Sequence, residues 1–211
     1  MTRALAVLRP EPGNAATAAR IEAIGRVAVR LPLFAVQPLA WTPPDPTQFD
    51  ALLLTSANAV RHAGAGLRVL RSLPVVAVGE ATARAARAAG LTVETVGTGD
   101  AAAAVGASGR KRLLHLGGRD RTDAGVATIA VYAADPIPVP TAAALAGCVA
   151  LLHSVRAARR LGELLARDGV TDVRVAALSA AVRAAGPVCP GAVADRPDDA
   201  TLVALAARLT D

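Results

Sequence analysis

The chain has 211 residues, of which 53% are hydrophobic and only 2% aromatic, and its formal net charge is +6. No run reaches the roughly 18 uninterrupted apolar residues that a membrane-spanning helix needs, which excludes a membrane protein. The apolar run at 4–8 is too short for a signal peptide, so we expect a cytoplasmic protein.

Short apolar runs alternate with helical patterns along the chain. Asn14 is expected to cap the first helix and Gly25 to end it. Continuous apolar strands alternating with helices are typical of parallel α/β sheets. The sequence predicts strands at 4–8, 27–34, 51–55, 75–79, 91–96, 112–118, 127–133, 149–154 and 173–179, and helices at 14–25, 57–71, 80–89, 155–167 and 198–209.

Proline-bearing segments near 35–46 and 133–141 interrupt this alternation. Proline cannot continue a helix and blocks pairing in central strands, so we interpret the two segments as connectors between two lobes. The first lobe is then discontinuous, comprising 1–35 plus 137–211. The second lobe, 38–134, is inserted into it.

An internal repeat supports two similar lobes. The phrase "ALLLTSANAV" at 51–60 resembles "VALLHSVRAA" at 149–158, and in each a strand meets a helix at a serine, Ser56 or Ser154. A second matched pair follows in the same order, at Gly79 and Ser179. Alanine-rich sequence produces chance matches, but two matches in order favour a duplicated arrangement.

Hydroxyl, amide and arginine side chains follow several predicted strands. In an open parallel sheet, ligands bind beyond the carboxyl ends of the strands, where helix N-termini favour anions. Taken singly, each turn is better explained as a helix cap. Together they predict a site for an anionic ligand. The turns contain Arg9, Thr55, Ser56, Asn58, Gly79, Thr82, Arg119 and Ser154.

Other kinds of site are not predicted. The sequence has no dinucleotide-binding or P-loop motif, and its three histidines lack metal-ligand spacing, so we expect no metal. Nearly all positive charge is arginine, which suits carboxylates or phosphates but is equally explained by biased composition. The arginines are scattered and aromatics are few, so we expect no nucleic-acid partner.

Five segments, in order, resemble the uroporphyrinogen-III synthase family. They are "FDALLLTSANAV", "VVAVGEATARAARAAGLTV", "LLHLGGRDR", "IAVYAAD" and "DDATLVALAARL", and the opening "VLRPEPGN" is similar as well. The resemblance implies an α/β fold of two similar lobes, each a parallel sheet flanked by helices, joined by a two-stranded connector.

The same resemblance implies an activity. The chain would be a cyclising hydro-lyase that closes hydroxymethylbilane to uroporphyrinogen III, inverting ring D and losing water. It implies no cofactor and a substrate with eight carboxylates. We also expect a monomer that receives its substrate from hydroxymethylbilane synthase.

The resemblance also implies roles for individual residues, wherever a motif of this sequence matches a motif of the family. Tyr132, the only tyrosine, matches the family's tyrosine at the return connector and is assigned a catalytic role, although a tyrosine at the core edge explains it equally well. The other matches imply substrate binding by Arg9, Thr55, Ser56, Asn58, Gly79, Thr82, Arg119, Ser154 and Ser179.

Two departures from the family pattern keep an alternative open. Ser179 stands where the family has a glycine, in "LSAAVRAAG", and the threonines usual there are missing. Between Arg119 and Tyr132 there is room only for a turn, which predicts a second lobe lacking one crossover helix and exposing a sheet face. The alternative is a non-catalytic two-lobed module that binds a polyanion or a tetrapyrrole.

Overall fold

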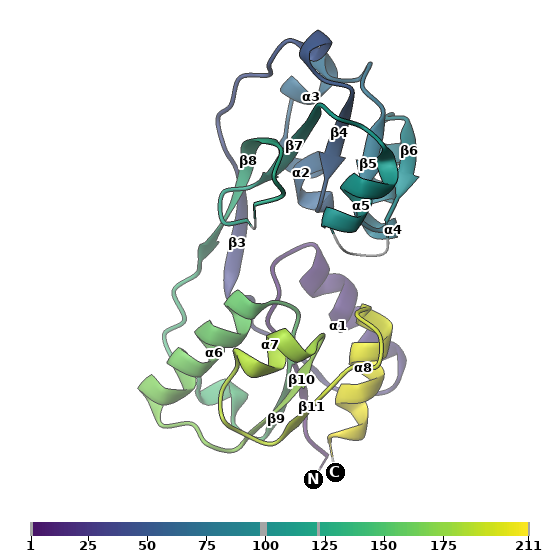
Figure 1. Ribbon diagram of the computed structural model, residues 1–211. Helices are drawn as coiled ribbons and strands as arrows, with labels where there is room; N and C mark the ends of the chain where they lie inside the picture. Colours follow the sequence, from purple (N-terminus) through teal and green to yellow (C-terminus); the bar gives the residue numbers. More distant parts are fainter. Residues whose placement is uncertain (1, 98–100, 122, 211) are drawn as a thin grey trace. The chain divides into compact units, whose positions relative to one another are not determined.

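The computed structural model describes residues 2–97, 101–121 and 123–210. The chain divides into two compact units. Unit 1 comprises Met1–Ala35 and Pro136–Asp211, and unit 2 comprises Val36–Asp135. Each unit is a largely parallel sheet with helices packed on it (Figure 1). The predicted α/β fold class is confirmed.

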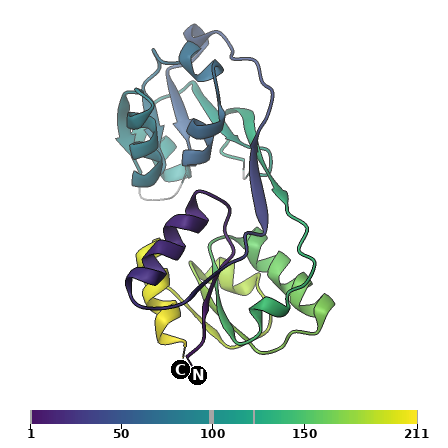
Figure 2. The same cartoon turned by 180° about the vertical axis from the view of Figure 1, so that it is seen from behind.

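Unit 1 is built on a five-stranded sheet in which every neighbouring pair is parallel. Helices α1 (Gly13–Ala23) and α8 (Asp199–Arg208) share one core with this sheet and lie side by side, while α6 (Val155–Asp168) and α7 (Ala180–Ala184) lie elsewhere on it (Figures 1 and 2). The strand order is β11 (Gly191–Val193), β10 (Val173–Ala177), β9 (Cys148–Leu152), β1 (Leu5–Val7) and β2 (Ala28–Arg30).

Unit 2 is built on a six-stranded sheet. Helices α2 (Ala57–His62), α3 (Gly66–Val69) and α4 (Glu80–Ala88) pack on one face, and α5 (Ala101–Ser108) packs on the other (Figure 1). The strand order is β3 (Phe34–Pro38), β8 (Ala127–Pro136), β7 (Leu113–Gly118), β4 (Ala51–Leu54), β5 (Val75–Ala77) and β6 (Val93–Val96). Short 3-10 turns occur at Pro46–Gln48 and Ala143–Leu145.

Serine caps begin the helix that follows the central strand of each unit. Ser56 Oγ accepts a hydrogen bond from the Asn58 N–H at 3.2 Å, and Ser154 Oγ accepts one from the Ala157 N–H at 3.2 Å. The caps satisfy amides that the helix itself cannot bond. They also hold both serines at the carboxyl ends of their strands, which is where the repeated phrase of the sequence places them.

The cap predicted for the first helix is wrong. Pro12 stands at the N-cap position, and Asn14 lies inside the helix. The buried Asn14 side chain donates to the carbonyl oxygens of Val7 and Arg9, at 2.8 and 3.0 Å. Its amide therefore links the end of β1 to the turn that precedes the helix.

Three element predictions also need correction. The helix expected at 57–71 is two short helices, because Gly64 adopts φ +60° between them. The strand expected at 27–34 is shorter, covering Ala28–Arg30, and a separate strand, β3, begins at Phe34. Helix α5 was not predicted.

The expectation of an exposed sheet face in the second lobe is wrong. Strands β7 and β8 are parallel neighbours, and no helix lies between them in residues 119–121 and 123–126, as the short sequence predicted. Ala104 of α5 nevertheless buries that face, together with Leu53 and Leu113 of the sheet. The helix after β6 covers this face together with Ala124 and Val126 of the β7–β8 connection.

Candidate active site

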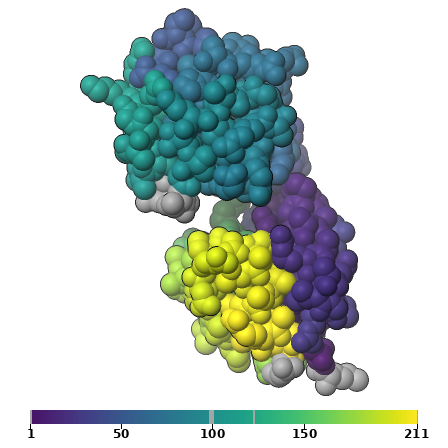
Figure 3. Space-filling view, turned by 90° about the vertical axis from the view of Figure 1, so that its right-hand side faces the viewer, coloured from purple at the N-terminus to yellow at the C-terminus, as the bar shows by residue number. Residues whose placement is uncertain are grey.

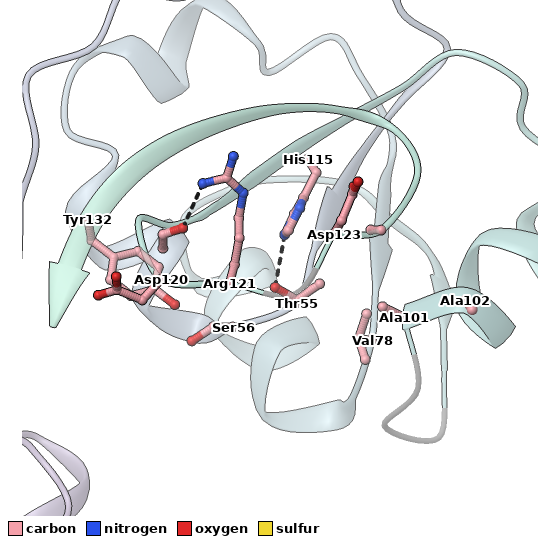
Figure 4. A pocket seen from close by; sticks show the side chains of 12 residues that line it. Thr55, Ser56, Val78, Ala101, Ala102, His115, Asp120, Arg121, Asp123 and Tyr132 are labelled. Carbon is pink, nitrogen blue, oxygen red and sulfur yellow. Dashed lines mark hydrogen bonds between the residues drawn. The ribbon is translucent and has the colours of Figure 1, made fainter. Parts of the chain in front are cut away.

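A pocket of about 700 Å³ lies in unit 2 at the carboxyl end of its parallel strands (Figure 4). Thr55 and Ser56 follow β4, Val78 follows β5, and Gly118 ends β7. The sheet topology gathers these strand ends because β7, β4 and β5 are neighbours. The lining residues are Thr55, Ser56, Val78, Ala101, Ala102, His115, Gly118, Asp120, Arg121, Asp123, Ala124 and Tyr132.

Two adjacent glycines make room for the rings at this pocket. A Cβ atom on Gly117 would lie 2.9 Å from the His115 ring, and one on Gly118 would lie 2.9 Å from the Tyr132 ring. Contacts that short force a displacement. Successive strand residues point to opposite faces, so the pair serves one ring on each side of β7.

His115 is buried and hydrogen-bonded at both ring nitrogens. Its Nε2 lies 3.0 Å from Thr55 Oγ1, as the dashed line in Figure 4 marks, and its Nδ1 lies 3.5 Å from Thr128 Oγ1. The side chain is only 1% exposed. Burial, and to a smaller extent the charge of Arg121, lowers the pKa of His115 to about 4. The imidazole is therefore neutral at pH 7.

Tyr132 lies on β8 opposite Gly118 of β7. Its ring packs against the core formed by α2 and α4 and lies 6.3 Å from the ring of His62, centroid to centroid. The side chain is only partly buried, and it lines the pocket. A phenol held in this way presents its hydroxyl to a ligand while its ring stays packed.

The charged side chains at the pocket have both signs. Arg121 Nη1 donates to the carbonyl oxygens of Gly118 and Arg119, at 3.0 and 3.4 Å, which holds the guanidinium against the end of β7. Asp120 and Asp123 also line the pocket. An anionic ligand would therefore meet one guanidinium between two carboxylates rather than a uniformly positive surface.

Unit 1 has a separate cluster around Asp199, the first residue of α8. The carboxylate accepts hydrogen bonds from His153 Nε2 and Thr17 Oγ1, both at 2.8 Å, and from Arg20 Nη1 at 2.5 Å. Arg9 Nη1 lies 3.4 Å from it. Burial would raise the pKa of Asp199, but the hydrogen bonds from His153 and Thr17 outweigh burial and lower the pKa to about 2.

The cluster joins α8 to the N-terminal part of unit 1. The space-filling view shows residues of α8 and of the N-terminal segment meeting at the surface (Figure 3).

Burial lowers the pKa of His153, although its hydrogen bond to Asp199 acts in the opposite direction. At neutral pH a neutral imidazole therefore donates its Nε2–H to an ionised carboxylate.

Three of the predicted site residues in unit 2, Thr55, Ser56 and Tyr132, line the pocket. Asn58 lies within α2, where its Oδ1 accepts from Arg61 Nη1 at 3.1 Å. Gly79 is the N-cap of α4, next to the lining residue Val78.

The other two predicted residues of unit 2 lie differently. The side chain of Thr82 is buried on α4, and its N–H donates to the Gly79 carbonyl at 3.0 Å. Arg119 Nη2 is paired with Asp135.

The predicted residues of unit 1 lie in their own turns, after β1, β9 and β10. Arg9 is within reach of Asp199, while Ser154 and Ser179 cap α6 and α7. Ser179 Oγ accepts from the Val182 N–H at 3.4 Å.

Sequence reasoning missed His115, Arg121 and Asp199. A signal existed for His115, which interrupts the leucines of β7 at a position facing away from Leu114 and Leu116. Its partner Thr128 comes from β8, however, and only the strand register brings the two together. The signal for Asp199 is weaker, because its partners come from α1 and from the turns after β1 and β9.

Neither a metal-ligand cluster nor a membrane-spanning helix is present among the described residues. Within residues 2–97, 101–121 and 123–210, no group of three or more His, Cys, Asp or Glu side chains is arranged to hold a metal ion. Among the described helices, none has both the length and the apolarity required to cross a membrane.

Two of three comparisons with known proteins, those with family models and with solved structures, found matches. A family model described as uroporphyrinogen-III synthase HemD matches residues 15–204. A search of curated protein sequences found no match.

Solved structures resemble the whole chain. The uroporphyrinogen-III synthetase of Helicobacter pylori 26695 is 17% identical, with a TM-score of 0.67 over 98% of this chain and 99% of that one. A mutant uroporphyrinogen III synthase of the extremely thermophilic bacterium Thermus thermophilus is 18% identical, with a TM-score of 0.58 over 95% of this chain and 96% of that one. Identities this low indicate a shared fold alone.

Proposed function

Because the chain belongs to the uroporphyrinogen-III synthase family, we propose that it closes hydroxymethylbilane to uroporphyrinogen III at the pocket of unit 2. The family is one of cyclising hydro-lyases. The non-catalytic binding module considered from the sequence therefore has no support. The observation that carries the location is the meeting of Tyr132, Thr55 and Ser56 around one pocket.

The reaction defines what the pocket must supply. Loss of the substrate hydroxyl generates an electrophilic azafulvene, and the substituted carbon of ring D attacks it to form a spiro intermediate, which fragments and recloses. The bilane also cyclises unaided to the unrotated type I isomer. The enzyme must therefore hold the linear bilane in a folded conformation and stabilise the transition state that leads to the type III isomer. These two tasks matter more than supplying a strong nucleophile.

We assign Tyr132 to the departure of the hydroxyl. A phenol can donate a hydrogen bond or a proton to that oxygen as the carbon–oxygen bond breaks. Support comes from the partial exposure of Tyr132 on the pocket and from the space that Gly118 leaves for its ring. In this assignment the packed ring fixes the direction of the hydroxyl.

Carboxylates of the substrate need donors, and unit 2 offers several. Arg121 has five N–H donors, and Nη1 alone makes its two bonds to backbone carbonyls. We propose Ser56, Asn58 and Gly79 as further contacts, through side chains or backbone. Thr82 and Arg119 stay predicted contacts, although Thr82 is buried and Arg119 is paired with Asp135.

Unit 1 would supply a second set of contacts. Arg9, Ser154 and Ser179 follow the carboxyl ends of β1, β9 and β10. A substrate with eight carboxylates can accept more hydrogen bonds than the donors of one pocket supply. We also propose a monomer that works in the cytoplasm and takes the bilane from hydroxymethylbilane synthase, because rapid transfer limits the unaided cyclisation.

Separation of the product isomers tests the function. The purified chain is mixed with bilane generated enzymatically, the products are oxidised to porphyrins, and the isomers are resolved by chromatography. We expect mainly type III with the chain and type I without it. Type I alone in both reactions would contradict the proposed function.

A further inference from the structure

The hydroxyl of Thr128 determines which nitrogen of His115 carries the proton. Thr128 Oγ1 donates its single proton to the Val126 carbonyl oxygen, at 2.9 Å. Towards His115 Nδ1, at 3.5 Å, the same oxygen can therefore act only as an acceptor. The proton of the neutral imidazole then lies on Nδ1, and Nε2 has a lone pair.

That lone pair sets the direction of the bond to Thr55. Thr55 Oγ1 lies 3.0 Å from His115 Nε2, so the threonine hydroxyl donates and the imidazole accepts. A hydroxyl has one proton and two lone pairs. With its proton committed to His115, Thr55 can offer only lone pairs to the pocket that it lines.

We propose that His115 is a positioning residue, which makes the Thr55 hydroxyl a hydrogen-bond acceptor for a pyrrole N–H of the bilane rather than a donor for its carboxylates. An ionised carboxylate has no proton to give, so it cannot bond to a group that only accepts. Each pyrrole ring of the bilane has one N–H donor. This inference rests on the proposed function, which supplies the substrate.

The surroundings of His115 hold its ring in this orientation. The ring packs directly against the backbone of Gly117, since a Cβ there would lie 2.9 Å from His115 Cε1 and Nε2 and 3.0 Å from the Cδ of Arg121. The charged groups that act on the ring are Arg121, which disfavours a positive imidazole, and Asp123, which favours one. Burial acts in the same direction as Arg121 and keeps the ring neutral.

The protonation of His115 can be measured directly on the full chain. The ¹⁵N chemical shifts of labelled histidine distinguish a protonated ring nitrogen from one with a lone pair. Comparison with His115→Gln assigns the signals among the three histidines. We expect Nδ1 to be protonated and Nε2 unprotonated at pH 7. A proton on Nε2 would overturn the inference, whether or not the chain is an active synthase.

A matched pair of variants tests the role of His115 in the reaction. In His115→Gln the amide oxygen can reach the position of Nε2 and accept from Thr55, whereas in His115→Asn the amide reaches only the position of Nδ1. We expect His115→Asn to raise KM about tenfold with kcat little changed, and His115→Gln to restore most of the loss. Equal losses in both would contradict the inference.

A double variant shows whether His115 acts through Thr55. We expect Thr55→Val with His115→Asn to bind the bilane no more weakly than Thr55→Val alone. Independent, multiplying losses would overturn the inference. Far-UV circular dichroism checks the fold of each variant, and if His115→Asn fails to fold, the ¹⁵N measurement on the unaltered chain still decides. A chain that yields only type I product would instead contradict the proposed function.

Discussion

Single side chains at the pocket depend on close neighbours that carry no chemistry of their own. Tyr132 and His115 both stand where a glycine of β7 leaves space for a ring. The family resemblance could identify Tyr132, because it is the only tyrosine in the chain. It could not identify His115, because one hydrogen-bond partner of this residue, Thr55, follows β4 and the other, Thr128, lies on β8.

Replacing Tyr132 by phenylalanine removes the hydroxyl and keeps the ring. If the phenol assists the departing hydroxyl, we expect kcat to fall by about 10²-fold or more, with an unchanged melting temperature. Steady-state kinetics with fresh bilane measures this, and circular dichroism is the control. Unchanged kcat would remove Tyr132 from the mechanism.

Replacing Gly118 by alanine tests the space beside Tyr132. The added methyl group would lie 2.9 Å from the tyrosine ring, so the ring must shift. We expect kcat to fall as the hydroxyl is displaced. Gly106→Ala is the control, because nothing lies within 4 Å of a Cβ there. Similar kinetics for the two variants would show that the ring position is not critical.

At the level of helices and strands, the sequence predicted the elements that have a clear local pattern. It failed for elements whose structure depends on packing against other parts of the fold. Strands β4 and β9 are continuous apolar runs, and α6 is capped by Ser154 at its start and by Gly169, with φ +65°, at its end. Helix α5 was missed because "AAAAVGAS" has no polar side chain before its last residue and so shows no helical periodicity. The helix is identified only in the structure, where Ala104 packs on the sheet.

The carboxylate of Asp199 ties α8 to α1 and to His153, the residue after β9, and its ionisation should stabilise unit 1. Its pKa is about 2 in the folded chain, below the ordinary value of 3.8, so the stabilisation is complete above pH 4 and is lost as pH falls from about 4 to about 2. One pKa unit corresponds to about 1.4 kcal/mol, so we expect Asp199→Asn to cost about 2 kcal/mol at pH 7.

Urea unfolding at pH 7 and pH 3 measures this effect. The difference between the unaltered chain and Asp199→Asn should shrink at the lower pH. Asp172→Asn is the control, because that carboxylate is 65% exposed and its ion pair with Arg3 should contribute little. An equal loss from Asp199→Asn at both pH values would contradict the assignment to ionisation.

For the whole molecule, the main feature is that unit 2 interrupts unit 1. The chain leaves unit 1 after Ala35 and returns to it at Pro136. These two crossing points lie next to each other, since the Ile137 N–H donates to the Leu33 carbonyl at 3.0 Å. The sequence predicts the connectors at the proline-bearing segments near 35–46 and 133–141. The sequence could not show this hydrogen bond, which depends on how two distant segments meet.

Each unit should therefore fold without the other. We expect a chain of 1–35 and 136–211, joined by an Asn-Gly turn, to give a cooperative thermal transition by circular dichroism. Residues 36–135 alone should do the same. Joining 1–35 to 146–211, which deletes Leu145 and other residues of unit 1, is the destabilised control. An unfolded joined chain would show that unit 1 depends on unit 2.

Because unit 2 is inserted between Leu33 and Ile137 of unit 1, the strands of unit 1 leave the ribosome in two separate groups. Strand β1 pairs with β2 on one side and with β9 on the other, and β9 emerges only after all of unit 2. At about 5–20 residues per second, roughly 100 intervening residues delay its second partner by about 5–20 s. During that interval the newly made amino-terminal segment exposes an apolar edge, which makes it a natural substrate for chaperones that act on nascent chains.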